Sequence, residues 1–155
     1  KKVTLGYQSF TADNNREVFS IDNIKYLPLI CYEIIYSGSL NKNNEDFDFI
    51  INISEDGWFG NSIGLQQHFS HSIFRAIEEG KSLIRSANNG TTAYIDPVGQ
   101  VVSVIESTQK GVIEVNSFKK VEKTFFSENG NIIFFYFLSF YIILIFFLKQ
   151  NRENK

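Results

Sequence analysis

The longest apolar run in the chain lies near its C-terminal end. Residues 132–148 read IIFFYFLSFYIILIFFL, and Ser139 is their one clearly polar member. At a rise of about 1.5 Å per residue, a helix of this length covers about 25 Å, close to the ~30 Å hydrocarbon core of a bilayer. Because a helix that is apolar all round needs protein or lipid on every side, we predict a membrane span; the alternative is a buried core helix.

The rest of the chain alternates short apolar runs with one amphipathic segment. Residues 26–30 and 47–53 are short and rich in apolar and β-branched side chains, which predicts two strands, the second of them buried on both faces of a sheet. Residues 66–79 place apolar side chains at helical spacing, and Gly80 follows where a left-handed glycine commonly ends a helix. We therefore predict an amphipathic helix after the second strand.

A β-hairpin is predicted further along the chain. Residues 93–95 and 101–105 flank Asp96-Pro97-Val98-Gly99, in which proline at the second position and glycine at the fourth suit a type I turn. Residues 111–115 add one more short strand, and strands in series around a helix indicate the α/β or α+β class. The predicted organisation is one folded domain over residues 1–118, a polar connector over 119–131, the membrane segment 132–148 and a short tail 149–155.

Composition excludes several classes of function. The 155 residues are 43% hydrophobic and 21% charged with a formal net charge of -2, so a folded core is expected and nucleic acid is not an expected partner. The single cysteine excludes an internal disulfide. His68 and His71 lack a third ligand at a recognised spacing, so we expect solvated or hydrogen-bonded histidines, no metal site and no cofactor.

Two further features concern the extent and the topology of the chain. It begins at Lys1 and contains no methionine, and we interpret it as part of a longer protein. Positive charges predict no orientation for the membrane segment, because the lysines that precede it are balanced by the lysines and the arginine that follow it.

Cys31 is the candidate nucleophile. It follows the apolar run of residues 26–30 and precedes Tyr32 and Glu33, so it lies where a predicted strand ends. A turn at a strand end exposes a side chain and aims the next backbone N–H at a developing oxyanion. A lone cysteine beside apolar residues is also typical of an inert core position. Glu33 fits two roles, the orientation of a nucleophile or substrate and a charge partner at a helix start.

Two polar segments also follow predicted strands. Residues 54–60, Ser-Glu-Asp-Gly-Trp-Phe-Gly, contain the single tryptophan, Trp58. α/β proteins place ligand sites at such carboxyl ends of strands, although a packed surface loop has the same composition. Residues 85–92 end in Asn-Asn-Gly-Thr-Thr, which fits a tight turn or a set of hydrogen-bond donors to a substrate.

An ordered set of motifs carries a family resemblance. The motifs are Ile30-Cys31-Tyr32-Glu33, Asn52-Ile53-Ser54 with Asp56, Trp58-Phe59-Gly60, Gln67-His68-Phe69, Arg75-Ala76, residues 85–91 and residues 95–100. Together they resemble the C-terminal half of the apolipoprotein N-acyltransferase family, within the nitrilase-like carbon–nitrogen hydrolase superfamily. The resemblance covers nearly the whole chain. Residues 132–148 resemble that family's last transmembrane helix, which soluble nitrilases lack.

The resemblance implies a fold, a location and a reaction. The fold is a partial αββα sandwich followed by one C-terminal transmembrane helix, in the bacterial inner membrane with the catalytic domain facing the periplasm. Cys31 is implied to take an acyl group from a phospholipid as a thioester and to pass it to the N-terminal diacylglyceryl-cysteine of an apolipoprotein. Glu33 is implied to support the nucleophile, and Tyr32 and Trp58 to position substrate.

The family also has features that this chain does not match. Its catalytic Glu and Lys lie upstream of the cysteine and have no counterpart here, so we expect the chain to need an upstream part of the same enzyme and to be inactive alone. Glu55 and Gly57 replace the family's usual Asn and Ala beside Trp58, which adds a charge near the expected site. Two alternatives stay open: a soluble nitrilase or amidase-type hydrolase, and a non-catalytic remnant.

Overall fold

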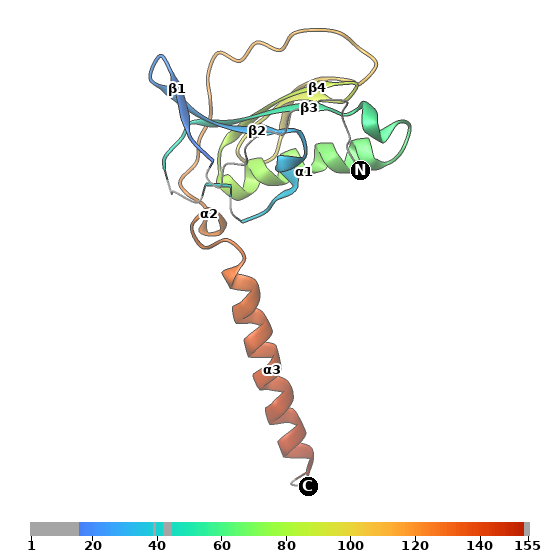
Figure 1. Ribbon diagram of the computed structural model, residues 1–155. Coiled ribbons are helices and arrows are strands. Elements are labelled where there is room, and N and C mark those ends of the chain that lie inside the picture. Colours follow the sequence, from blue (N-terminus) through green and yellow to red (C-terminus); the bar gives the residue numbers. More distant parts are fainter. Residues whose placement is uncertain (1–15, 39, 42–44, 154–155) are drawn as a thin grey trace, which may run out of the picture.

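The structure is a computed structural model that describes residues 16–38, 40–41 and 45–153. Within these residues six strands form one sheet, in the order in which they occur in the chain (Figure 1). The three central strands run parallel, and the outer ones pair antiparallel with their neighbours. The strands are β1 (Phe19–Ile21), β2 (Ile24–Ile30), β3 (Phe49–Glu55), β4 (Ser82–Asn88), β5 (Thr92–Ile95) and β6 (Val101–Ile105).

One long helix, α1 (Gly64–Glu79), lies along one face of this sheet (Figure 1). It ends at Gly80, whose φ of 63° is in the left-handed region that glycine adopts readily. The predicted helix is therefore confirmed, and so are the two predicted strands, which correspond to β2 and β3. The apolar core of the domain includes Leu27, Leu29, Ile50, Ala76, Leu83 and Ile95.

The two faces of the sheet are covered to different extents. Along β3, Ile50 is 0% exposed, whereas Ile53, which points to the opposite side, is 51% exposed. The prediction that this strand is buried on both faces is therefore wrong, because the described residues pack a helix against one side alone. We call the side that carries Ile50 the α1 face, and the side that carries Ile30, Ile51 and Ile53 the open face.

A long loop, residues 106–119, arches across the open face (Figure 1). The end of this loop packs on the sheet, where the Phe118 ring stacks on the Phe49 ring with centroids 4.1 Å apart. The strand predicted over residues 111–115 is wrong, because in the described structure this segment pairs with no strand and Val112 is 87% exposed. The segment passes over the sheet instead of lying beside β6, so its backbone has no neighbouring strand with which to form β-sheet hydrogen bonds.

The predicted hairpin is confirmed between β5 and β6. The Asp96 side chain accepts hydrogen bonds at Oδ1 from the N–H groups of Val98 and Gln100, at 3.1 and 2.9 Å. Gly99 has a φ of 84°, and a Cβ atom there would lie 2.6 Å from Ile77 on α1. Glycine is therefore favoured at this turn by the left-handed backbone, and it also leaves room for the Ile77 side chain of the helix.

The chain leaves the domain through residues 119–131, predicted as a polar connector. This segment includes a short helix, α2 (Phe125–Asn129), which Thr124 caps by accepting a hydrogen bond from the Ser127 N–H at 3.0 Å. α3 (Ile132–Glu153) follows and projects from the domain on its α1 side (Figure 1). Residues Ile132–Gln150 have a mean hydropathy of 2.4, and none of this segment is buried. Length and composition therefore suit a membrane-spanning helix.

Candidate active site at Cys31

Cys31 lies on a tight turn at the carboxyl end of β2. It begins the short 3₁₀ helix η1 (Cys31–Ile35) and has a φ of 49°, in the left-handed region. Such a conformation costs a non-glycine residue about 1–3 kcal/mol, which the surrounding contacts must offset. The thiol side chain is partly exposed. The expected position of Cys31 at a strand end is confirmed, and its backbone resembles the turns that present nucleophiles.

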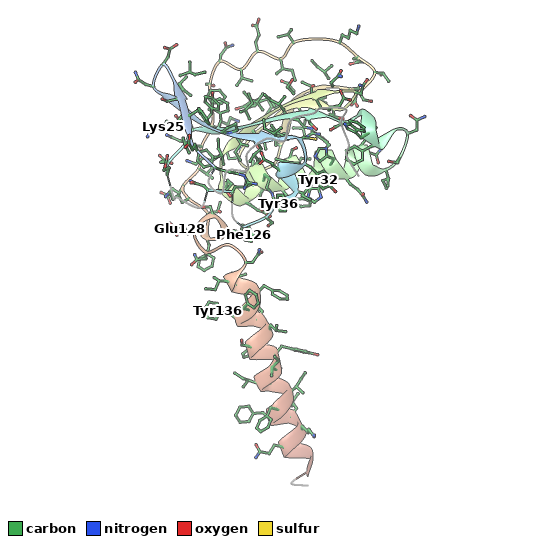
Figure 2. The ribbon with its side chains drawn as sticks, viewed as in Figure 1. Lys25, Tyr32, Tyr36, Phe126, Glu128 and Tyr136 are labelled. Atoms are coloured by element: carbon green, nitrogen blue, oxygen red, sulfur yellow. The ribbon has the colours of Figure 1, made fainter. Side chains whose placement is uncertain are left out.

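Glu33 braces this turn through the backbone. Its Oε2 accepts a hydrogen bond from the Ile30 N–H at 2.7 Å, so the carboxylate closes the corner between β2 and η1. Tyr32 lies between Cys31 and Glu33 and is 54% exposed. Figure 2 shows Tyr32 and Tyr36 on the same side of the sheet as α1. Three of the four site residues expected from the sequence thus share one turn.

Trp58, the fourth, lies on a separate short helix after β3, η2 (Gly57–Phe59), and is 68% exposed. The two segments meet at a buried histidine. The His68 ring of α1 has its centroid 5.5 Å from the Tyr32 ring and 5.3 Å from the Phe59 ring. His68 therefore joins the Cys31 turn to the loop that carries Trp58. Of the two settings expected for a histidine, solvated or hydrogen-bonded, His68 has the second, because its Nδ1 is hydrogen-bonded to Asp56.

A buried polar cluster lies directly behind the thiol. Ser54 Oγ is 3.6 Å from Cys31 Sγ and donates to Asp56 Oδ1 at 2.6 Å. Arg85 on β4 donates from Nη2 to Asp56 Oδ2 at 2.7 Å, and both side chains are 0% exposed. His68 Nδ1 lies 3.0 Å from Asp56 Oδ1. Side chains from β3, β4 and α1 thus converge on one carboxylate, which Ser54 links to Cys31.

Asp56 is ionised at neutral pH although it is buried. Burial by itself raises the pKa of this carboxyl, but hydrogen bonds from His68 and Ser54 and the charge of Arg85 outweigh burial and lower it to about 2. An ionised oxygen at 2.6 Å is a much stronger acceptor than a sulfur at 3.6 Å. The single hydroxyl hydrogen of Ser54 is therefore directed at Asp56, which leaves an oxygen lone pair facing the thiol.

Asn52 connects this cluster to the backbone of the turn. Its side chain is fully buried on the α1 face of β3. The Asn52 Nδ2 group donates to the carbonyls of Leu29 and Cys31, at 3.0 and 3.3 Å, and its Oδ1 accepts a hydrogen bond from Arg85 Nη1. The cluster therefore reaches Cys31 from two directions, through Ser54 at the thiol and through Asn52 at the carbonyl.

The sequence contained a signal for this cluster that pattern reading missed. Asn52, Ser54 and Asp56 occur at every second position, so in a strand all three point to one face. Arg85 pairs directly with Asn52 in the register of β3 and β4. Polar residues repeated on the face where a core is expected indicate a buried network. The positive charge of this network, Arg85, comes from β4, and the sequence alone did not predict the register of β4 against β3.

Glu55, the charge that departs from the family's usual loop, is engaged locally. Its carboxylate accepts hydrogen bonds from the Gly57 N–H at 2.8 Å and from the side chains of Asn89, at 2.9 Å, and Asn88. The Asn89 contact, followed by those of Gly57 and Asn88, lowers the pKa of Glu55. Within the described residues, no group of three or more His, Cys, Asp or Glu side chains is arranged to hold a metal ion.

Comparison with known sequences identifies relatives that are much longer than this chain. The apolipoprotein N-acyltransferase of Rickettsia bellii is 41% identical over 149 residues, which are 91% of this chain and 30% of that protein. The protein of the same name from Wigglesworthia glossinidia brevipalpis is 38% identical over 83% of this chain and 26% of its own length. The chain thus spans about a third or less of the length of these curated relatives.

Comparison with solved structures supports the same fold. An amidase from Nesterenkonia sp. superposes with a TM-score of 0.50 over 63% of this chain and 40% of that chain, at 14% identity, so the likeness concerns the fold alone. The carbon–nitrogen hydrolase family matches residues 5–117, which include every strand of the sheet, α1 and the Cys31 turn. The chain therefore belongs to the carbon–nitrogen hydrolase family, with an α/β fold of the nitrilase type.

Proposed function

We propose that this chain carries the nucleophile of an apolipoprotein N-acyltransferase, and that Cys31 is that nucleophile. The observation that carries the proposal is the setting of Cys31. The single cysteine of the chain occupies a left-handed turn at a strand end, backed by a buried carboxylate cluster, in a sequence 41% identical over most of its length to an enzyme of that name.

In the proposed first half-reaction, Cys31 Sγ attacks the carbonyl carbon of a phospholipid acyl ester. A general base takes the thiol proton, the S–C bond forms, and the carbonyl oxygen becomes an oxyanion that the Tyr32 N–H stabilises. Collapse of this intermediate breaks the ester C–O bond. The protonated base returns its proton to the leaving oxygen, and lysophospholipid departs, leaving a thioester on Cys31.

In the second half-reaction the acceptor is the α-amino group of a lipoprotein's diacylglyceryl-modified N-terminal cysteine. The amine nitrogen attacks the thioester carbon, the C–S bond breaks, and the amine proton passes through the base to the Cys31 sulfur. The exposed rings of Tyr32 and Trp58 are the proposed contacts for the substrates. Glu33 supports the nucleophile by its hydrogen bond to the Ile30 N–H.

The apolar helix supports the membrane enzyme over a soluble amidase-type hydrolase. A helix with no buried residues and a mean hydropathy of 2.4 exposes an apolar surface that promotes aggregation in water and is stable in a bilayer. We propose a bacterial inner-membrane location with the Cys31 domain in the periplasm and the Lys149 end of α3 in the cytoplasm. A reporter that works only in the cytoplasm should then be active when it is fused after Lys155. A reporter that works only in the periplasm should be inactive there, and its activity would reverse the proposed topology.

The open face supports the participation of an upstream part of the same enzyme. Ile30 and Ile53 expose more than half of their surface on a sheet whose other side is packed. In an αββα sandwich this face lies against a second sheet, and this chain spans about a third or less of the length of its curated relatives. The proposed upstream part also supplies the Glu that acts as base and the Lys that assists the oxyanion, so the chain alone is expected to be inactive.

The test combines mass spectrometry with complementation. The chain is co-expressed with an upstream part that carries the Glu and Lys motifs, purified in detergent and incubated with phospholipid. We expect a hydroxylamine-sensitive acyl adduct on Cys31, absent from Cys31→Ala, and acyl transfer to a diacylglyceryl peptide by the pair but not by the chain alone. An adduct that persists in Cys31→Ala contradicts the assignment, and a pair that forms no adduct supports the non-catalytic alternative.

A further inference from the structure

The backbone carbonyl of Cys31 is held from inside the protein. Asn52 Nδ2 donates to this carbonyl at 3.3 Å and to the Leu29 carbonyl at 3.0 Å. The two carbonyls lie on either side of Ile30, where β2 turns into η1. A single buried amide group therefore ties both limbs of the turn to the α1 face of β3.

A carbonyl that points inward directs the next N–H outward. Among the described residues no peptide bond is cis, so the bond between Cys31 and Tyr32 is trans and its C=O and N–H point in opposite directions. Because the Cys31 carbonyl is aimed at Asn52, the Tyr32 N–H is aimed away from the core. This N–H follows the nucleophile, and acyl-transfer sites use such a donor for the developing oxyanion.

Arg85 determines which way the Asn52 amide faces. An asparagine side chain can be turned end for end with little change of shape, but only one orientation presents its oxygen to a donor and its NH₂ to two acceptors. Nη1 of Arg85 donates to Asn52 Oδ1 and to Ser72 Oγ, and Nη2 donates to Asp56 Oδ2. The charged cluster thus fixes the amide, and the amide fixes the peptide plane.

We propose that Asn52 and Arg85 are positioning residues for acyl transfer at Cys31. They hold the Cys31 carbonyl so that the Tyr32 N–H is aimed at the oxyanion of the tetrahedral intermediate. Neither side chain touches the reacting atoms. The inference rests on the proposed role of Cys31 as nucleophile and deepens it, because it assigns the geometry of the oxyanion donor to a buried amide on the neighbouring strand β3 and to the guanidinium on β4 that orients this amide.

The test compares two reagents that share a nucleophile and differ in the oxyanion. p-Nitrophenyl acetate acylates Cys31 through a tetrahedral oxyanion: the S–C bond forms, p-nitrophenolate leaves with the electron pair, and the thiol proton passes to solvent. Iodoacetamide alkylates the same sulfur by displacing iodide, with no oxyanion. Both rates depend equally on exposure of the thiol and on its ionised fraction. Their ratio, measured on the whole chain in detergent at mildly alkaline pH, therefore reports oxyanion stabilisation.

Three variants separate positioning from general damage. Asn52→Asp keeps an acceptor for Arg85 but loses both donors to the turn, and Arg85→Lys keeps the charge beside Asp56 but loses the two-pronged guanidinium. Tyr94→Phe is the matched control, because it removes a buried hydroxyl from β5 whose partners are Ser82 and Ser117 and lie outside the turn. Thermal unfolding of each variant checks that it is folded.

We expect the acylation-to-alkylation ratio to fall by roughly 10²-fold in Asn52→Asp, since a small misplacement of a catalytic group has effects of that order. A smaller fall, about tenfold, is expected in Arg85→Lys, and none in Tyr94→Phe. If Asn52→Asp does not fold, Arg85→Lys decides alone. A ratio that is unchanged in the folded variants overturns the inference, and so does a wild-type ratio equal to that of a free cysteine peptide.

The same measurement separates failure of this inference from failure of the proposed function. If the chain is still acylated in Cys31→Ala, another group is the nucleophile. This result contradicts the proposed function itself, and with it the inference that rests on it. Acylation that depends on Cys31 but is insensitive to Asn52 and Arg85 leaves the nucleophile in place and removes only the positioning role.

Discussion

The α1 face and the open face of the sheet differ in how completely their side chains are satisfied. On the α1 face, Asn52, Asp56 and Arg85 are fully buried, and each has a charged or hydrogen-bonded partner from another element. On the open face, the apolar side chains of Ile30 and Ile53 stay exposed beneath a loop. The comparison teaches that the described residues pack and pair the side of the sheet behind Cys31, and that they leave on the other side an apolar surface that suits another layer of protein.

The largest expected effect comes from breaking the buried ion pair. Asp56→Asn leaves the Arg85 guanidinium buried without a counter-charge. Such a change typically lowers the free energy of unfolding by about 3–5 kcal/mol, and we expect a loss of about 4 kcal/mol here. Urea unfolding in detergent, followed by the fluorescence of Trp58, measures this loss. A loss below about 1 kcal/mol would show that water reaches the cluster and that the α1 face is less closed than the structure indicates.

The same residue gives the stability of the α1 face a pH dependence. Because the pKa of Asp56 is lowered from 3.8 to about 2, its contribution to stability is present above pH 3.8 and is lost as the pH falls toward 2. The wild-type unfolding midpoint should therefore fall steeply in this window. In Asp56→Asn this part of the acid dependence should be absent, and an unchanged acid profile would contradict the assignment.

A matched pair on β3 tests the comparison of the two faces directly. Ile50→Ala, beneath α1, removes fully buried atoms and should cost about 2–5 kcal/mol. Ile53→Ala, three positions later on the open face, should cost under about 1 kcal/mol in the chain alone. With the upstream part present, Ile53→Ala should become the more costly of the two for association. Equal effects of both substitutions on the chain alone would remove the distinction between the faces.

A somewhat smaller effect is expected at Glu79, where α1 ends. Burial, and then the adjacent Glu78, raise the pKa of this carboxyl from 4.5 to about 7. The folded state therefore prefers the protonated acid, so the contribution of Glu79 to stability is most favourable below pH 4.5 and becomes unfavourable as the pH rises to 7. Glu79→Gln should stabilise the chain by about 2–3 kcal/mol above pH 7 and have little effect near pH 4. Equal effects at both pH values would contradict this assignment.

The smallest effect is expected from an exposed ion pair. Asp48 accepts a hydrogen bond from Lys120 at 3.1 Å, with both side chains in contact with solvent. Asp48→Asn should change the unfolding free energy by about 0–1 kcal/mol, and added salt should abolish the difference. It also serves as the matched control for Asp56→Asn, since both replace one carboxylate by an amide. A loss as large as that of Asp56→Asn would show that charge alone, independent of burial, sets these effects.

Local features of the fold could be predicted where one short segment contains the whole cause. Gly80 ends α1 and the Asp96 turn joins β5 to β6, because each is specified by residues within a few positions. Cys31 at the end of β2 was predictable for the same reason. The failures are all non-local. Residues 111–115 have a strand-like composition but no edge to pair with, and the one-sided burial of β3 depends on what packs against the sheet.

The sequence by itself determined the family motifs, the place of the candidate nucleophile Cys31 at a strand end and the apolar helix α3, because each is carried by residue identity or by a run of neighbours. Only the tertiary structure decided that Asn52, Asp56, His68 and Arg85 form one buried cluster behind Cys31, since these residues come from three elements and meet through strand register and helix placement. It also decided which side of the sheet is packed. Long-range contacts have no periodic signature in a single sequence, and they set the geometry on which the proposed chemistry of Cys31 depends.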